Sequence, residues 1–229
     1  MEDPCWVVAD CETTGLSPKR DRIISIAASC RGKEFSEFVN PGCPIPAEST
    51  EIHHITDEDV REAHSWSSVS ERFWEWIKEQ ADGRRVVIVA HNSKFDTSMI
   101  AAEDARLSRR PHYPPLEVVD TLVVCRRKLP GLESYKQSSV YEHLFGSSPE
   151  GQHNALFDVQ ALLRICSHPT ISEAFLKFSH ALDLVELGDE LLRAPKPAKK
   201  SRSGPSKCPK CSKTIVFGKH VCLSVDPRV

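Results

Sequence analysis

Short runs of apolar residues, bounded by polar or turn-forming residues, recur along the chain and predict β-strands. The first run, Val7 to Ala9, ends at Asp10. Runs at residues 23–28 and 34–39 flank Arg31 and Gly32 and predict two strands that form an antiparallel meander with the first. Residues 86–90 and 116–120 predict two more strands, so we expect a five-stranded sheet.

The spacing of apolar residues becomes helical between and after the later strands. It predicts helices at residues 94–106, 121–128, 138–145, 154–166 and 172–192, and a short capped helix that starts at Thr56. Strands followed by strand–helix alternation indicate a mixed α/β fold, in which helices cover a sheet with an antiparallel edge. A further helix has an apolar face that we interpret as core rather than as a base-stacking platform: Trp66, Val69, Phe73, Trp76 and Ile77.

Charge is unevenly distributed along this chain, whose formal net charge is only −2. Residues 191–225 contain no Asp or Glu but many Lys and Arg, and residues 194–205 lack apolar periodicity. Such a segment is typical of a flexible basic linker. We therefore expect a main domain at residues 1–182, a helix end and linker at 183–207, and a small module at 208–229.

The compartment is predicted from what the sequence lacks. Residues 1–4 do not have the basic and apolar stretches of a signal peptide, and no run is long enough to span a bilayer. We expect an intracellular protein without a membrane partner, in the nucleus, the cytoplasm or both, and residues 197–202 resemble a short nuclear localisation signal. The nine cysteines are then expected to be reduced.

Two carboxylates stand one residue apart at the end of the first strand. Because strand side chains alternate between faces, Asp10 and Glu12 point the same way and repel each other, which favours a cation between them. Cys11 lies on the opposite face, where we assign it to packing. The alternative interpretation is that the two acids are simply solvated at a strand end.

Two later segments also place an Asp at the boundary of an apolar element. Asp96 follows a buried strand, and Asp158 lies near the start of a helix for which Asn154 is a plausible N-cap. Carboxylates without clustered soft ligands suit hard cations such as Mg²⁺ or Mn²⁺. His153, in the loop before this helix, is a suitable general base for an attacking water.

These three segments resemble the exonuclease motifs of the DnaQ-like DEDD superfamily. They match D-x-E-T-T-G at residues 10–15, H-N-x-x-F-D at 91–96 and H-x-A-x-x-D at 153–158, and the last His places the resemblance in the DEDDh branch. It covers about residues 5–180 and implies an RNase H-like fold. It also implies two Mg²⁺ or Mn²⁺ ions at Asp10, Glu12, Asp96 and Asp158, with His153 deprotonating the water.

The implied reaction is 3′→5′ removal of nucleoside 5′-monophosphates from a nucleic acid. Asn92 and Phe95 are implied to support the site, and the residues implied to bracket the terminal nucleotide are Thr13, Thr14, Leu16, His54 and Ile55. Relatives near the three-prime-repair exonucleases, and a vertebrate branch related to the C-terminal region of the promyelocytic leukaemia protein, act on DNA, whereas others process RNA. We favour DNA over RNA, and either a monomer or a homodimer fits the resemblance.

The C-terminal module has a metal-binding pattern of its own. Its spacing, C-x₂-C-x₈-H-x-C, predicts one structural Zn²⁺ held by Cys208, Cys211, His220 and Cys222. The alternative is a disordered basic tail with incidental cysteines. Such a module would contact nucleic-acid phosphates or a protein partner, and a catalytically silent adaptor that works through it is the competing interpretation of the whole chain.

Overall fold

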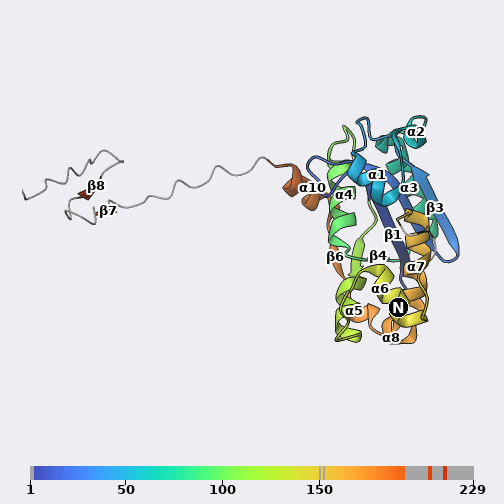
Figure 1. Ribbon diagram of the computed structural model, residues 1–229. Helices are drawn as coiled ribbons and strands as arrows, with labels where there is room; N and C mark the ends of the chain where they lie inside the picture. The colour runs from blue at the N-terminus through green and yellow to red at the C-terminus, as the bar shows by residue number, and fades with distance from the viewer. Residues whose placement is uncertain (1–2, 150, 152, 194–205, 208–213, 216–229) are drawn as a thin grey trace, which may run out of the picture. The chain divides into compact units, whose positions relative to one another are not determined.

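The computed structural model describes residues 3–149, 151, 153–193, 206–207 and 214–215 (Figure 1). The chain divides into two units, Met1–Arg193 and Ala194–Val229. The described residues of the second unit form strands β7 (Ser206–Lys207) and β8 (Thr214–Ile215), which pair antiparallel. The first unit includes residues 183–193, for which the sequence predicts a helix end and the start of a linker. The expected zinc ligands lie outside the described residues.

A six-stranded mixed sheet forms the centre of the first unit, in the order β3-β2-β1-β4-β5-β6. Strands β1, β4 and β5 are parallel to one another, whereas β2 and β3 extend one edge antiparallel and β6 extends the other. The six strands have these bounds: β1 Cys5–Thr13, β2 Ile23–Cys30, β3 Lys33–Phe38, β4 Val86–Ala90, β5 Leu116–Asp120 and β6 His180–Leu182. The mixed α/β sheet with an antiparallel edge is thus confirmed.

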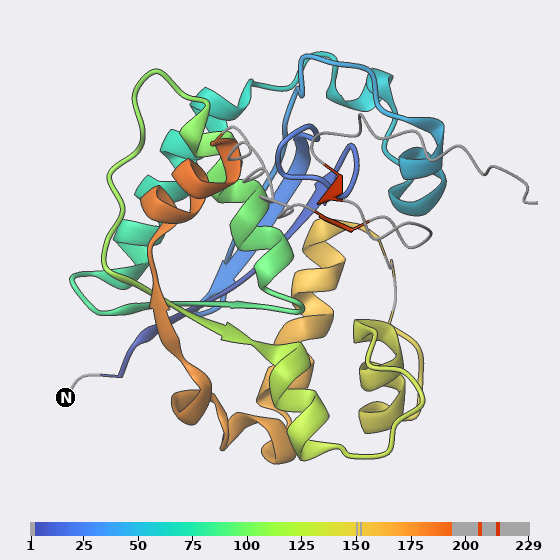
Figure 2. The same cartoon turned by 90° about the vertical axis from the view of Figure 1, so that its left-hand side faces the viewer.

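Ten helices lie between or after the strands of the sheet along the described part of the chain. They cover both faces of the sheet. Their bounds are α1 Ala47–His53, α2 Asp57–Val60, α3 Trp66–Ala81, α4 Lys94–Ala105, α5 Thr121–Lys128, α6 Gln137–Phe145, α7 Ala155–Ser167, α8 Pro169–Ser172, α9 Phe175–Phe178 and α10 Leu184–Leu192. Helix α10 lies alongside α4 in both ribbon views (Figures 1 and 2). Among the described residues, no helix is both long and apolar enough to cross a bilayer.

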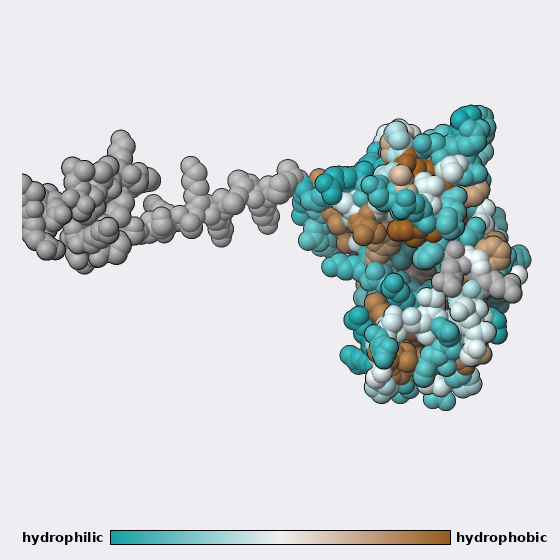
Figure 3. All heavy atoms as spheres, viewed as in Figure 1, coloured by the Kyte–Doolittle hydropathy of each residue, from teal (hydrophilic) through white to brown (hydrophobic). Residues whose placement is uncertain are grey.

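The alternation of side chains along β1 separates two hydrophobic cores. Cys5, Val7, Ala9 and Cys11 pack with residues of α3, α4 and α10. Val8, one position out of phase, packs with residues of α5, α6 and α7. The surface seen in Figure 3 is mostly hydrophilic, with scattered hydrophobic patches, as expected for helices that turn their apolar faces to a central sheet.

The first core contains one buried carboxylate with a complete set of hydrogen bonds. Asp104 of α4 accepts from the indole N–H groups of Trp66 and Trp74, from Ser70 Oγ and from the Tyr113 hydroxyl. Four donors compensate for its burial, although burial still raises its pKa. These bonds join α3, α4 and the loop of residues 106–115 that precedes β5.

The expected number of strands and the last expected helix are wrong. Residues 172–192 form α9, β6 and α10 rather than one helix, and β6 becomes the sixth strand by pairing with β5. Asp183 explains where α10 starts, because its Oδ1 caps the N–H groups of Val185 and Glu186. Apolar residues continue at near-helical spacing through this region, which hides the short strand.

Candidate active site

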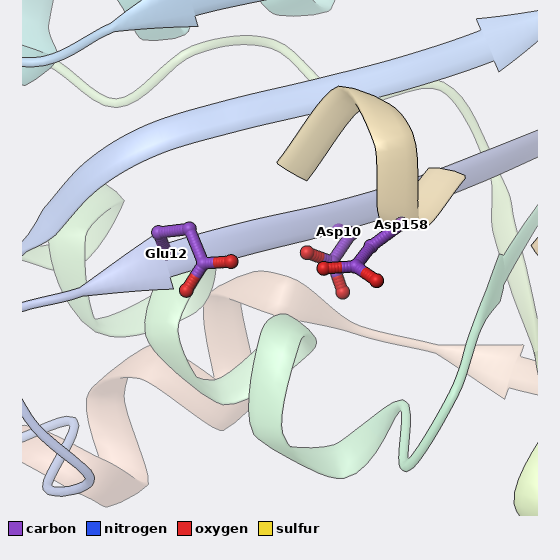
Figure 4. A group of neighbouring side chains, drawn as sticks. All are labelled: Asp10, Glu12 and Asp158. Carbon is purple, nitrogen blue, oxygen red and sulfur yellow. The ribbon is translucent and has the colours of Figure 1, made fainter. Parts of the chain in front are cut away.

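Three carboxylates meet at the end of β1. Asp10 and Glu12 lie opposite Ala27 and Ser25 of β2 and share the face of the sheet that α7 covers. Asp158 comes from the first turn of α7. One oxygen of each carboxylate lies within 4.8 Å of the others, and Figure 4 shows the Asp10 and Asp158 carboxylates side by side. The predicted proximity of these three acids is therefore present in the structure.

Local sequence positions Asp158 and His153 around the start of α7. Asn154 is the N-cap, as expected, and its Oδ1 accepts from the N–H groups of Leu156 and Phe157. His153 precedes it with a φ of 64°, and its main-chain N–H donates to Asp158 Oδ2 at 2.9 Å. Its imidazole side chain is exposed. The loop position expected for His153 is thus found next to the acidic cluster.

Asp96 approaches from the opposite face of β1. It lies in the first turn of α4 and is buried, and its Oδ1 accepts from Cys11 N–H at 3.2 Å and from Cys11 Sγ at 3.3 Å. Cys11 packs in the core, as predicted, but its hydrogen bonds to Asp96 were not anticipated. The strand end therefore receives one acid from α4 on one side and one from α7 on the other.

Burial and mutual repulsion make these acids hard to ionise. Burial, then the charges of Asp96, Glu12 and Asp158, raise the pKa of Asp10 well above its ordinary value. Burial, then Asp158 and Asp96, raise the pKa of Glu12 to about 7, and burial raises the pKa of Asp96 to about 7 despite its bonds from Cys11. Burial also raises the pKa of Asp158, against the effects of His153.

The donor set fits a hard divalent cation. Asp10, Glu12 and Asp158 take part in none of the ion pairs among the described residues, so their repulsion is not offset by Lys or Arg there. Oxygen ligands on three acids, without an imidazole or thiolate in the cluster, match the preference of Mg²⁺ or Mn²⁺. The same arrangement without a cation would carry a large electrostatic cost.

The turn after β1 is held in place by polar contacts. Thr13 Oγ1 donates to the Gly15 carbonyl, Thr14 Oγ1 accepts from Arg22 N–H, and both threonines are buried. A Cβ on Gly15 would lie 2.6 Å from Asp21 Oδ2, so a larger residue there would require the Asp21 side chain to move. Leu16 projects from this turn with 84% of its surface exposed. Its exposure is compatible with the contact to a terminal nucleotide that the sequence resemblance implies.

The last residue of α1, His53, is a histidine that is not among the expected site residues. His53 is buried and accepts from Ile55 N–H, and its Nε2 has no hydrogen-bond partner among the described residues. Burial lowers the pKa of His53. His54 is exposed, whereas Ile55 packs in a small apolar cluster. The expected nucleotide contacts of His54 and Ile55 stay predictions.

The turn before α4 positions the remaining expected residues. Asn92 has a φ of 65°, donates its N–H to Asp120 Oδ1 and accepts at its carbonyl from Phe95 N–H. Phe95 packs against the first core. These contacts lead the chain from β4 into the helix turn that carries Asp96. The supporting role expected for Asn92 and Phe95 is therefore compatible with their places in the fold.

The chain matches a protein-family model described as "Exonuclease" over residues 7–166. It is 34% identical over 170 residues to the DNA polymerase III PolC-type of Streptococcus pneumoniae serotype 2 (strain D39 / NCTC 7466), and the same identity is found with that of Streptococcus sanguinis (strain SK36). Each alignment covers 72% of this chain and only 11% of the polymerase. The chain thus spans about a tenth of the length of these relatives.

Three solved structures have a similar fold. Exonuclease X in complex with 5′ overhanging duplex DNA has a TM-score of 0.51 and 24% identity, covering 73% of this chain and 98% of that one. A 3′-exonuclease described in 3′-end specific recognition of histone mRNA stem-loop has a TM-score of 0.64 and 17% identity, over 78% and 70%. Exonuclease I has a TM-score of 0.61 and 16% identity, over 76% and 44%.

Proposed function

Since this chain belongs to the exonuclease family, within the DnaQ-like proteins of RNase H-like fold, we propose that it removes nucleoside 5′-monophosphates from the 3′ end of DNA. The observation that carries the proposal is the group of three carboxylates at the end of β1, with His153 beside it. Their order and spacing along the chain are those of the DEDDh branch, to which we assign this protein.

Asp10, Glu12 and Asp158, with Asp96 from the other face, would hold two Mg²⁺ or Mn²⁺ ions. Such ions, when bound, activate a water and stabilise the leaving oxygen of a phosphodiester. The elevated pKa values of Glu12 and Asp96 support this assignment, because carboxylates that are costly to ionise alone become favourable as ligands of a cation.

His153 would accept the proton of the attacking water at its imidazole. The main-chain bond to Asp158 Oδ2 fixes the backbone of His153 next to the cluster, while the exposed side chain is free to turn toward a substrate. A general base must lie within hydrogen-bonding reach of the proton it removes, directly or through one water. Leu16 and the neighbouring threonines would contact the terminal nucleotide.

DNA is favoured over RNA by the sequence relatives, which are DNA polymerases at 34% identity. The alternative is trimming of RNA 3′ ends, and the fold of the 3′-exonuclease described with histone mRNA is compatible with it. A catalytically silent adaptor is the alternative from another class.

The test is to incubate the full chain and Mg²⁺ with 3′- or 5′-labelled single-stranded DNA, duplex DNA and RNA of one sequence. We expect mononucleotides from the 3′ end of DNA, and a 5′ label that stays on progressively shorter strands. Faster release from RNA would support the alternative substrate, and no release from any substrate would contradict an exonuclease.

Two variants separate this activity from a contaminating nuclease. Asp10→Asn removes one charge of the acidic cluster and is expected to abolish release. Glu75→Gln removes one charge from an exposed position on α3 and should leave release unchanged. Activity in Asp10→Asn equal to that of the unmodified chain would mean that the nuclease is not this protein.

A further inference from the structure

Gln137, the first residue of α6, contacts Asp158 across the interface of α6 and α7, which lie beside each other. Its side-chain Nε2 donates to the Asp158 carbonyl at 2.8 Å and lies 3.3 Å from Asp158 Oδ1. Asp158 Oδ2 accepts from His153 N–H at 2.9 Å. Both carboxylate oxygens of Asp158 are therefore oriented by donors that come from outside its own helix.

An oriented Asp158 matters because its neighbours repel it. Asp10 and Glu12 lie within ligand distance, and a carboxylate with no fixed donor would rotate away from two anions toward solvent. An ionised carboxylate has about four lone-pair positions, and the bonds from Gln137 and His153 use two of them. The remaining positions stay available to a cation, so the donors and a metal ion can be accommodated together.

An amide suits this position better than a charged donor. The Gln137 side chain donates hydrogen bonds without adding a positive charge that would compete with a divalent cation for Asp158. A carboxylate of similar length would instead add a further anion to the cluster. The neutral donor fixes the geometry and leaves the charge of the cluster unchanged.

We propose that Gln137 is a positioning residue for the metal site: it fixes the Asp158 carboxylate in the orientation that binds the cation and, through Asp158 Oδ2, fixes the backbone of His153. The inference rests on the proposed exonuclease function and deepens it. Partners that orient metal ligands typically change metal affinity or activity by about 10–100-fold when they are removed.

A merely structural role predicts a different outcome. Within an α-helix the carbonyl of Asp158 also accepts from the N–H four residues later, so it keeps a partner when the Gln137 bond is removed. The loss of that bond should therefore change the unfolding temperature little. The role of Gln137 is to be found in metal binding and rate rather than in stability.

The decisive variant is Gln137→Met in the full chain, which keeps the side-chain length and removes the donor. We expect Mn²⁺ affinity, measured by calorimetry or electron paramagnetic resonance, to fall by about 10-fold. We also expect kcat to fall by about 10–100-fold while KM stays within about twofold. The unfolding temperature should change little.

Gln160→Met is the matched control. Gln160 lies on α7 two residues after Asp158, and its amide donates to Glu34 Oε1 at 3.0 Å, away from the acidic cluster. This variant should keep the Mn²⁺ affinity and the rate of the unmodified chain. Unchanged Mn²⁺ affinity in Gln137→Met, or a lower unfolding temperature as its only effect, would overturn the inference. The Mn²⁺ titration needs no substrate, so its result stands even if no nuclease activity is found.

Discussion

His153 makes two separable contributions at the scale of single residues. Its main chain donates to Asp158, and its side chain is the proposed general base. His153→Ala keeps the main-chain bond and removes the imidazole, so we expect kcat to fall by about 10²–10⁴-fold while Mn²⁺ affinity is retained. Steady-state kinetics and Mn²⁺ titration measure the two effects.

His143→Ala, at an exposed position on α6, is the control for the loss of a histidine. Full activity in His153→Ala would contradict the assignment of the general base. Loss of Mn²⁺ binding in the same variant would instead mean that the imidazole itself is needed to bind the metal.

Residue patterns allowed part of this site to be predicted. The alternation of faces in a strand places Asp10 and Glu12 together, and the N-cap Asn154 places Asp158 in the first turn of α7. The contact of Gln137 with Asp158 could not be predicted in this way, because it depends on how α6 packs against α7. The burial of His53 Nε2 without a hydrogen-bond partner in the described part of the chain likewise becomes visible only once the chain is folded.

At the scale of elements, the packing of α10 on α4 is a specific contact. A Cβ on Gly188 would lie 2.4 Å from the Ala101 carbonyl oxygen and 2.9 Å from Ala105 Cβ. Gly188→Ala should therefore lower the free energy of unfolding by about 1–3 kcal/mol, measured by denaturant titration.

Glu186→Ala is the control for this substitution, because Glu186 is exposed on the same helix. Alanine is the better helix former, so a destabilised Gly188→Ala cannot be attributed to helix propensity. Unchanged stability in Gly188→Ala would mean that α10 does not pack on α4 in solution.

The sequence predicts strands more reliably at the centre of the sheet than at its edge. Long apolar runs such as Ile23 to Ala28 are unambiguous, and the structure confirms all five expected strands. The sixth, β6, has three residues and is mostly exposed, so no apolar run marks it. Its existence depends on pairing with β5, which is tertiary information.

For the whole molecule, the acidic cluster makes stability depend on pH and metal. The pKa of Glu12 is raised from 4.5 to about 7 in the folded protein. Without metal, Glu12 therefore contributes its full share to the free energy of unfolding below about pH 4.5, and this contribution is lost as the pH rises through about 7. In EDTA at pH 8, the free energy of unfolding of Glu12→Gln should therefore exceed that of the unmodified chain by roughly 2 kcal/mol, and its unfolding temperature should be higher. Both differences should shrink toward pH 5.

Comparison of two variants isolates this effect. Burial lowers the pKa of His53 and His91, so these histidines reduce the free energy of unfolding as the pH falls below 6.5, opposite to the effect of Glu12. Both histidines are present in Glu12→Gln and in the unmodified chain, so their effect cancels in the comparison. Glu75→Gln is the exposed control and should show no such difference. Added Mg²⁺ or Mn²⁺ should reverse the order, because only the unmodified chain keeps the complete ligand set. Equal stability of Glu12→Gln and the unmodified chain at every pH in EDTA would contradict a raised pKa of Glu12 in the folded protein.

The zinc ligands are proposed from the sequence and are tested on the full chain. We expect about one equivalent of zinc in the purified protein, measured by elemental analysis, and its loss in Cys208→Ser. Cys43→Ser, at an exposed cysteine of the first unit, should retain the metal. A protein without zinc before any substitution would leave the alternative of incidental cysteines.

The strict alternation of faces in β1 has a consequence for how this protein can evolve. Insertion or deletion of one residue before Asp10 would turn both acids toward α3 and α4 and place Cys11 on the face that α7 covers, so that Asp158 would lose both acidic neighbours. The strand is therefore constrained in length as well as in composition. The turn of residues 14–22, in which Leu16 is exposed, follows the strand and lies outside that register. Changes of length there can alter how a substrate end is held while the acids keep their places.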